Sequence, residues 1–292
     1  MIISHILGGL GNQMFQYAAG RALSLRLHQP LSLDLNGFSD YQLHQGFNLS
    51  DVFQCDTQVA AEDEIQTLLG WRSSHKVRSL LLKPQLQWLR GGAFVVEPHF
   101  HYWPEFSDIG SGCYLYGYWQ SEKYFKQITD IVRCDFTFRH PFQERNLELA
   151  QQISTSTSVS LHVRRGDYVS DAKTNSTHGV CSPDYYRDAV AYVAEKLSAP
   201  CFFIFSDDIQ WCKENLDLDF PTVYIDHNRG GESYRDMQLM SLCDHHIIAN
   251  SSFSWWGAWL NPSVEKIVIA PKNWFAAGHR TDDLIPSEWM RL

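Results

Sequence analysis

Apolar residues along the chain recur in short runs that alternate with amphipathic stretches. The first 35 residues fit a strand over 2–7, a glycine-rich turn over 8–11, a helix over about 13–27 and a second strand over 31–35. A β-α-β opening favours a parallel sheet covered by helices. The pattern therefore predicts an α/β protein from its first elements.

The same alternation becomes regular from about residue 144. The expected helices cover 144–153, 183–197, 209–215, 232–243 and 253–260, and the expected strands cover 158–163, 201–205, 222–225, 246–249 and 266–270. This order predicts a doubly wound α/β domain. The stretch 36–112 is irregular, with helical patches over 61–69 and 77–89 and an aromatic-rich segment over 94–106, and we expect it to hold insertions.

A chain of 292 residues with 44% hydrophobic content is long enough for one large domain or two smaller ones. The pair His140-Pro141 interrupts the pattern, so we expect two domains, 1–140 and 141–292, with a boundary near 139–143. The C-terminal tail can pack back on the first domain.

The composition limits which ligands the protein is expected to bind and in which cellular compartment it is expected to lie. With 24 Lys+Arg against 33 Asp+Glu the net charge is −9, which does not favour binding to nucleic acid or to an anionic membrane. The seven cysteines are scattered without a Cys-x-x-Cys pair and are expected to be reduced core thiols. We find no signal-peptide pattern before Gly8 and no membrane-spanning window, so we expect a soluble, cytoplasmic protein.

Polar clusters follow four of the expected strands, where ligands bind in open α/β sheets, and one of them is residues 9–13 after the first strand. Arg164, Arg165 and Asp167 follow the strand 158–163, and guanidinium groups pair bidentately with phosphate. Read alone, this run could be a turn with a local ion pair. The other clusters are Ser206, Asp207 and Asp208, and Asn250, Ser251, Ser252, Phe253 and Ser254. In the last, Ser252 can cap a helix whose first amides form an anion site, although an ordinary serine cap explains the same residues. Together the clusters predict a phosphorylated ligand.

The glycine-rich turn over 8–11 resembles a dinucleotide-binding turn but lacks its third glycine, since that position is Met14. It leaves Gly11 without a side chain and sets Asn12 and Gln13 as neutral hydrogen-bonding groups for a hydroxyl-rich ligand. Trp119 follows the apolar run 113–117 and is the aromatic residue expected to face a ligand.

No metal site is expected. The pairs His99/His101 and His245/His246 lack further ligands at metal spacing. Asp217-Leu218-Asp219 imitates a cation-binding acidic motif but lies in a polar connection, and Asp207-Asp208 is explained more simply by helix capping.

Five motifs in order resemble the α-1,2-fucosyltransferases, glycosyltransferase family 11, and most closely the bacterial members of O-antigen synthesis. They are residues 8–17 (GGLGNQMFQY), 117–120 (GYWQ), 162–168 (HVRRGDY), 205–208 (FSDD) and 249–257 (ANSSFSWWG). The resemblance spans Gly8 to about Pro271.

The resemblance implies a GT-B-type fold of two Rossmann-like domains with a cleft between them. It also implies GDP-fucose as donor, a β-galactoside as acceptor, inversion at the fucose anomeric carbon and no metal requirement. On this reading 1–140 is the acceptor side and 141–292 binds GDP-fucose. The β-phosphate would be held by Arg164, while Arg165 and Asp167 would support it and the recognition of guanine or ribose. His162 and Tyr168, in the same motif, are further candidates for substrate binding. The turn 250–254 would hold phosphate or ribose, and Asn12 would reach the donor phosphate or the acceptor.

The sequence leaves the acceptor's proton unassigned. Asp34, at the end of the second strand, is the positional favourite for a base, His162 is expected behind the arginines, and a departing phosphate that takes the proton needs no base. The resemblance to enzymes of O-antigen synthesis is also consistent with a lipid-linked O-antigen acceptor and with peripheral association with the inner membrane. The alternatives are a non-catalytic sugar-nucleotide binder, and α-1,6 or peptide O-fucosyl transfer with the same arginine motif.

Overall fold

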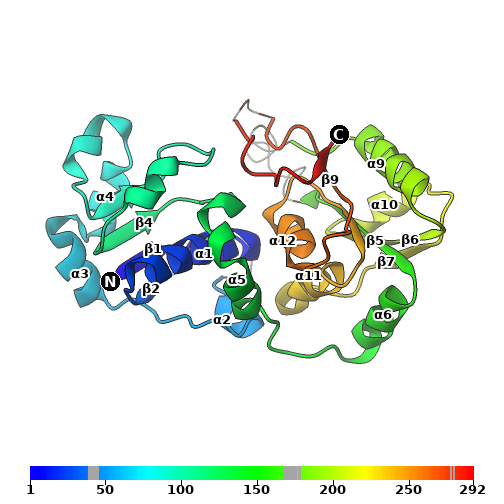
Figure 1. Ribbon diagram of the computed structural model, residues 1–292, viewed down its shortest axis with the longest axis horizontal. Helices are drawn as coiled ribbons and strands as arrows, with labels where there is room; N and C mark the ends of the chain where they lie inside the picture. Colours follow the sequence, from blue (N-terminus) through cyan, green and yellow to red (C-terminus); the bar gives the residue numbers. More distant parts are fainter. Residues whose placement is uncertain (39–45, 167–175, 177–178, 277, 279) are drawn as a thin grey trace. The chain divides into compact units, whose positions relative to one another are not determined.

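The computed structural model describes residues 1–38, 46–166, 176, 179–276, 278 and 280–292, and it divides into two compact units (Figure 1). Unit 1 comprises Met1–Arg139 and Asp282–Leu284, and unit 2 comprises His140–Thr281 and Ile285–Leu292. Each unit is built on its own parallel sheet.

The sheet of unit 1 has four parallel strands in the order β2-β1-β4-β3. Their bounds are β1 Ile2–His5, β2 Leu31–Asp34, β3 Phe94–Val96 and β4 Cys113–Tyr116. In the register, Ile2 pairs with both Leu31 and Cys113. Because β1 lies between β2 and β4, the turns that follow these three strands meet at one edge of the sheet.

Helices cover both faces of this sheet. The first helix, α1 (Leu10–Leu27), packs so closely on β1 that Ser4 Oγ donates to the Gln16 carbonyl at 3.0 Å. On the other face, α3 (Glu62–Leu69) and α4 (His75–Leu81) bury an apolar cluster against the strands, formed by Ile3, Ile65, Leu69, Leu81, Phe94 and Tyr114. The remaining helices of unit 1 are α2 (Leu49–Val52) and α5 (Thr129–Asp135).

The middle of unit 1 is more ordered than its pattern predicts. The predicted irregular stretch 36–112 holds a sheet strand, β3, and the patch expected over 77–89 divides into α4 and a 3-10 helix over Pro84–Leu89. Pro84 has no N–H and disfavours helical backbone at the residue before it, and Lys83 is extended at φ −64°, ψ 132°. Proline therefore ends the expected helix.

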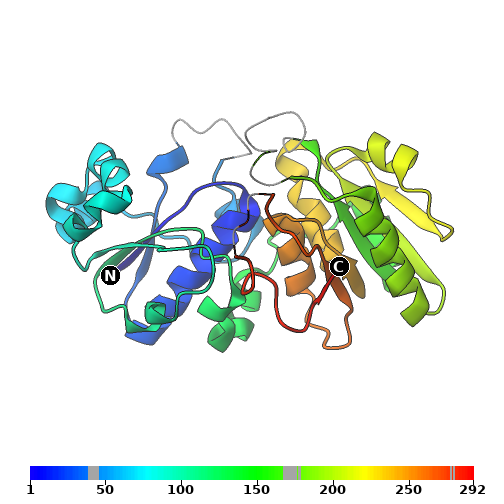
Figure 2. The ribbon, with the colours of Figure 1, turned by 90° about the horizontal axis from the view of Figure 1, so that it is seen from above.

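The sheet of unit 2 has six parallel strands in the order β10-β9-β8-β5-β6-β7, which lie side by side in Figure 2. Their bounds are β5 Thr157–Val163, β6 Pro200–Ser206, β7 Thr222–Ile225, β8 His245–Ile247, β9 Val268–Ala270 and β10 Met290–Arg291. Strand β5 is buried from Ser158 onwards, as expected of a central strand covered on both faces.

Two apolar clusters flank this sheet and make unit 2 a three-layer structure. On one face α9 (Pro183–Lys196) and α10 (Ile209–Asn215) pack on Val159, Leu161 and Ile204. On the other, α6 (Glu144–Ser154) and α11 (Tyr234–Met240) pack on Phe203 and Phe205, and α12 (Ser252–Leu260) contacts α11. The doubly wound arrangement predicted from the alternation is confirmed.

In the described part of the chain, every helix is too short or too polar to cross a bilayer. The cysteines are all unpaired, as expected, and most are buried.

Candidate functional site

The sheet order of unit 2 brings the predicted phosphate-binding residues to one edge. After β5, the chain adds β6 and β7 on one side and then returns to add β8 and β9 on the other. Val163 pairs with Ser206, and Leu161 pairs with Ile247, so Arg164, Asp207 and Asn250 follow neighbouring strands. The gap between β5 and β8 is a topological switch point, where ligands bind in open α/β sheets.

The two arginines are fixed by the residues that follow β6. Arg164 Nη1 lies 2.9 Å from Asp207 Oδ2, and the Arg165 amide donates to Asp207 Oδ1 at 2.9 Å. The guanidinium of Arg165 lies 4.1 Å from the ring centre of Trp211, and its Nε is 3.5 Å from Asp208 Oδ2. Arg164 remains 26% exposed. The site thus offers a cation that is both oriented and accessible to an anion.

Gly166 permits this close packing. A Cβ at that position would lie 2.8 Å from Asp207 Oδ2 and 3.1 Å from its Cγ, so a larger residue would displace the carboxylate. Trp211 is a further residue of the site that sequence reasoning missed. Its position three residues after Asp208, in the first turn of the next helix, was the available signal.

His162 is buried in β5, two residues before Arg164, and is neutral at physiological pH. Burial, helped by the nearby Arg164 charge and opposed by the attraction of Asp207, lowers the pKa of its imidazole to about 4. The Nδ1 atom is buried and has no hydrogen-bond partner among the described residues. A buried imidazole nitrogen without a partner is a candidate contact for a ligand.

The turn after β8 differs in part from the prediction. The helix cap is Ser251, whose Oγ accepts from the Phe253 amide at 3.3 Å, and Ser252 is the first helical residue, so the expected cap at Ser252 was wrong by one position. Asn250 is buried and donates to the carbonyls of Gly179 (3.3 Å) and Trp274 (3.2 Å).

The side chains of this turn differ in how far they are buried. Ser254 is buried and donates to the Ser251 carbonyl, whereas Ser252 and Phe253 are half-buried and remain reachable. The predicted ligand contacts of Asn250 and Ser254 are therefore corrected to internal hydrogen bonds.

The residues after β6 cap the next helix as predicted. Ser206 Oγ accepts from the Asp208 amide at 2.9 Å, and Asp208 Oδ1 accepts from the Trp211 amide at 3.2 Å. Asp207, between them, pairs with Arg164.

In unit 1 the glycine-rich turn and the segment after β4 converge. Gly8 has φ +80°, a conformation that favours glycine, and it leads into α1. Asn12 Oδ1 accepts from Gln120 Nε2 at 2.6 Å, so two neutral amide groups lie together at the carboxyl ends of β1 and β4.

Gln13 and Gly11 are buried in this turn. Gln13 Nε2 donates to the carbonyls of Gly8 (2.9 Å) and Gly46 (2.8 Å), and its Oε1 accepts from the Asn48 amide at 3.0 Å. Gln13 thus braces the turn from inside, and its expected ligand contact is corrected to a structural one.

Asp34 is an anchor within unit 1. It is 1% exposed, pairs with Arg78 at 3.2 Å, and accepts hydrogen bonds from Tyr114 and from the Asn36 amide. Although burial opposes it, hydrogen bonds from His5, Tyr114 and the Asn36 amide hold the pKa of Asp34 well below its usual range. A carboxylate in this environment is a weak proton acceptor, so the structure argues against the expected base.

Trp119 is fully buried, with its ring against Phe106 and Tyr124 at centroid distances of 5.2 and 5.4 Å. The expectation that it stacks on a ligand was wrong, because the apolar indole fills the core of unit 1. Tyr118, before it, is 41% exposed.

The other sequence candidates carry no metal cluster. Among the described residues no group of three or more His, Cys, Asp or Glu could hold a metal ion. His246 is buried between Ser160 Oγ (2.8 Å) and Asn261 (3.0 Å), as a core histidine would be. The candidates Asp167 and Tyr168 lie outside the described residues.

Comparisons with known proteins agree with this arrangement. A sequence model described as glycosyl transferase family 11 matches residues 100–292. The chain is 37% identical to an α-1,2-colitosyltransferase of Escherichia coli, over 100% of this chain and 99% of that protein. It is 32% identical to the O-antigen biosynthesis glycosyltransferase WbnK of Escherichia coli, over 99% of both.

Among solved structures, the fold is similar to that of the α-1,6-fucosyltransferase NodZ in a crystal soaked with GDP-fucose. The TM-score is 0.55 at 16% identity, covering 89% of this chain and 92% of that one. This likeness and the two parallel sheets confirm the predicted GT-B-type fold of two Rossmann-like units.

Proposed function

This chain belongs to glycosyltransferase family 11, and from that premise we propose that it is an inverting, metal-independent α-1,2-fucosyltransferase. It transfers L-fucose from GDP-β-L-fucose to the 2-hydroxyl of a terminal β-galactoside. The observation that carries the proposal is Arg164, held by Asp207 at the switch point of unit 2 and still accessible to an anion.

The chemistry needs a fixed positive charge at the leaving group. As the bond between the fucose anomeric carbon and the β-phosphate oxygen breaks, the diphosphate gains negative charge, and an oriented guanidinium stabilises that charge without reorganising. Arg164 supplies this cation. Arg165, stacked on Trp211, keeps its charge beside the same phosphates.

Other residues of unit 2 would hold the nucleotide. The neutral imidazole of His162, with its unpartnered Nδ1, suits a hydrogen bond to the guanine or ribose. Ser252 and Phe253, half-buried at the start of α12, would contact ribose or phosphate, where the helix dipole favours an anion.

The acceptor oxygen forms the new bond to the anomeric carbon and must lose its proton. The buried, ion-paired Asp34 is excluded from our proposal as the base, so we assign the proton to the departing phosphate, which becomes more basic as it gains charge. Asn12 and Gln120, joined by a hydrogen bond in unit 1, would orient the acceptor hydroxyls.

A second donor is favoured by one observation. The relative that is 37% identical over the whole chain is an α-1,2-colitosyltransferase, and colitose is L-fucose without its 3-hydroxyl. Arg164 and Arg165 would serve GDP-colitose equally well, because they would bind the diphosphate and not the sugar.

The test incubates purified protein with EDTA, GDP-fucose or GDP-colitose, and a panel of β-galactosides that includes lactose and lacto-N-biose. We expect GDP release only with acceptor, and linkage to the galactose 2-hydroxyl. Donor binding without GDP release would identify a non-catalytic binder. A 6-linked product, or fucosylation of peptide alone, would reject the α-1,2 assignment, and loss of activity in EDTA would reject metal independence.

The biological acceptor is a lipid-linked O-antigen unit in this proposal, in keeping with the O-antigen glycosyltransferase that is 32% identical. Such an acceptor would bring the enzyme to the inner face of the cytoplasmic membrane. Co-sedimentation with vesicles that carry the lipid-linked acceptor, compared with vesicles that lack it, tests this association.

A further inference from the structure

Glu97 is a carboxylate of unit 1 for which the mechanism above has no use. It directly follows β3, and its amide donates to the Tyr116 carbonyl at 2.8 Å. Its Oε2 accepts from the Tyr118 amide at 2.7 Å and its Oε1 from the Trp119 amide at 3.1 Å. Both carboxylate oxygens therefore accept hydrogen bonds from the turn that follows β4.

That turn needs such support. Trp119 has φ +55°, the left-handed region that a residue with a Cβ rarely adopts, so its backbone is strained. The same packing requires glycine at position 117, since a Cβ on Gly117 would lie 2.4 Å from the Cβ of Glu97. The hydrogen bonds from Glu97 hold the strained turn in place.

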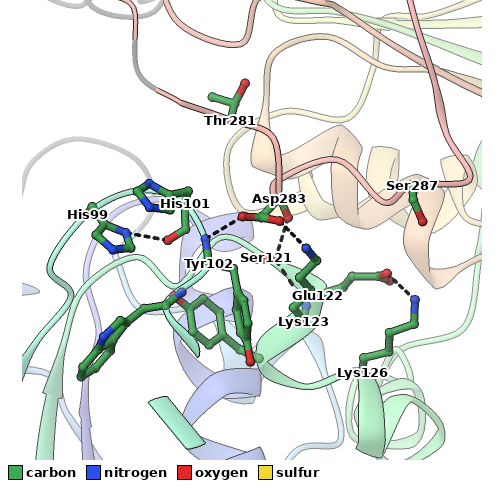
Figure 3. A network of polar contacts seen from close by, with 12 residues as sticks. His99, His101, Tyr102, Ser121, Glu122, Lys123, Lys126, Thr281, Asp283 and Ser287 are labelled. Atoms are coloured by element: carbon green, nitrogen blue, oxygen red, sulfur yellow. Dashed lines mark hydrogen bonds and ion pairs between the residues drawn. The ribbon is translucent and has the colours of Figure 1, made fainter. Parts of the chain in front are cut away.

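The far side of the turn is fixed as well. The Ser121 amide donates to the Trp119 carbonyl at 2.8 Å, and Ser121 Oγ donates to the Asp283 carbonyl at 2.6 Å. Figure 3 shows Asp283 at the centre of these contacts, where its carboxylate also accepts from the Tyr102 amide and pairs with Lys123. Between the two anchors the position of one residue, Gln120, is set.

Gln120 connects this turn to the start of α1. Its Nε2 donates to Asn12 Oδ1 at 2.6 Å, and its side chain is nearly buried while Asn12 is half-buried. A contact path therefore runs from the Glu97 carboxylate through two backbone amides to Gln120 and then to Asn12.

We propose that Glu97 is a positioning residue for the sugar acceptor: by holding the Gly117–Gln120 turn it fixes the Gln120 and Asn12 amides that bind acceptor hydroxyls. The inference rests on the proposed function, in which these amides face the acceptor. It assigns Glu97 no contact with the reacting atoms.

The surroundings of Glu97 make this role dependent on pH. Burial raises the pKa of Glu97 to about 7, although the two amide hydrogen bonds oppose that rise. The Glu97 carboxylate also faces the Tyr124 phenol, whose pKa its charge helps to raise, after burial. Protonation removes the negative charge and turns one carboxylate oxygen into a hydroxyl, which is a weaker acceptor, so the two amides of the turn are held less firmly.

The experiment compares Glu97→Gln with Glu105→Gln, which changes an exposed carboxylate of unit 1. For the wild type we expect the acceptor KM to rise as the pH falls from 8 to 6. For Glu97→Gln we expect a KM at least about tenfold higher and independent of pH, with kcat and the Kd for GDP within about twofold. Glu105→Gln should match the wild type.

A double-mutant cycle with Gln120→Met separates positioning from a general loss of structure. If Glu97 acts through Gln120, the two substitutions together should raise KM no more than the larger single effect. Gln120→Met also tests the path if Glu97→Gln fails to fold, since it should raise KM without touching the carboxylate.

An unchanged KM for Glu97→Gln, or additive effects in the cycle, would overturn the inference. A fall in kcat of about 100-fold at constant KM would do so too, because it would make Glu97 a catalytic base. Failure of the proposed function is a separate result, since the wild type itself would then transfer nothing to any β-galactoside.

Discussion

Replacing Arg164 by alanine should abolish transfer while leaving the fold intact. The ion pair with Asp207 joins side chains that are each 26% exposed, and such pairs contribute at most about 1 kcal/mol to stability. In a unit of this size that corresponds to a fall in Tm of roughly 2–4 °C. The stabilisation of a developing oxyanion by one fixed donor is larger, about 3 kcal/mol or more, or over 100-fold in rate.

The assay measures GDP release with a saturating β-galactoside, together with thermal unfolding of the same preparation. Arg187→Ala is the matched control, because Arg187 is an exposed arginine of unit 2 paired with Asp184. It should retain full activity. Arg164→Lys keeps the charge but loses the planar fork, so we expect activity between those of the wild type and the alanine variant.

Retention of a tenth or more of the activity by a folded Arg164→Ala protein would refute the reasoning. Such a loss is only about 1.4 kcal/mol, too little for the main stabiliser of the leaving group. Full activity of Arg164→Lys would show that a point charge suffices, and would reject bidentate binding of the phosphate.

Three further substitutions test the electrostatics of unit 2. Gly166→Ala should weaken GDP binding about tenfold in a titration with little change in Tm, because the alanine Cβ would displace the Asp207 carboxylate that orients the arginines. An unchanged affinity for GDP would contradict the close packing of Gly166 on Asp207. The folded-state pKa of His162, about 4, lies below its ordinary 6.5, so its contribution to stability is present above pH 6.5 and is lost as the pH falls towards 4. In urea unfolding, His162→Gln should therefore reduce the loss of unfolding free energy on acidification by up to about 3 kcal/mol. An identical pH profile for the variant would argue against a neutral buried imidazole. Burial raises the pKa of Asp236 from 3.8 to about 7 against the opposing hydrogen bond from Asn228, so stability falls as the pH rises through this range. Asp236→Asn can still accept the 2.8 Å hydrogen bond and should stabilise the protein at pH 8 by at most about 4 kcal/mol but not at pH 4. Equal stability of the two proteins at pH 8 would refute the assignment.

Much of unit 2 could be predicted because its elements are long and strictly alternating. The helices and strands between residues 144 and 270 occur where the pattern puts them, with their ends shifted by a few residues. In unit 1, β3 has three residues, and in unit 2, β10 has two. β8 and β9 also have three residues each, but they were predicted because each falls in an apolar run at its expected place in the helix–strand alternation. β3 and β10 lie outside that alternation, and only pairing with a neighbouring strand makes them strands.

The arginine site was recognisable because its partners lie in sequence-local motifs at strand ends. The sheet order that makes β5 and β6 neighbours then pairs Arg164 with Asp207, 43 positions apart in the numbering. Trp211, which supports Arg165, was missed because an isolated tryptophan in a helix is usually a core residue.

The sequence by itself determined the α/β class, the family motifs and the residue types that can hold a diphosphate, because periodicity and local chemistry lie along the chain. Tertiary structure alone decided which polar residues are available. Asp34 is paired with Arg78 and hydrogen-bonded by Tyr114, and Gln13 is hydrogen-bonded to the backbone of its own turn. Trp119 is buried in the core of unit 1. Tertiary structure also brought Glu97 to the turn after β4. Availability depends on burial and on partners distant in sequence, and both arise only when the chain packs.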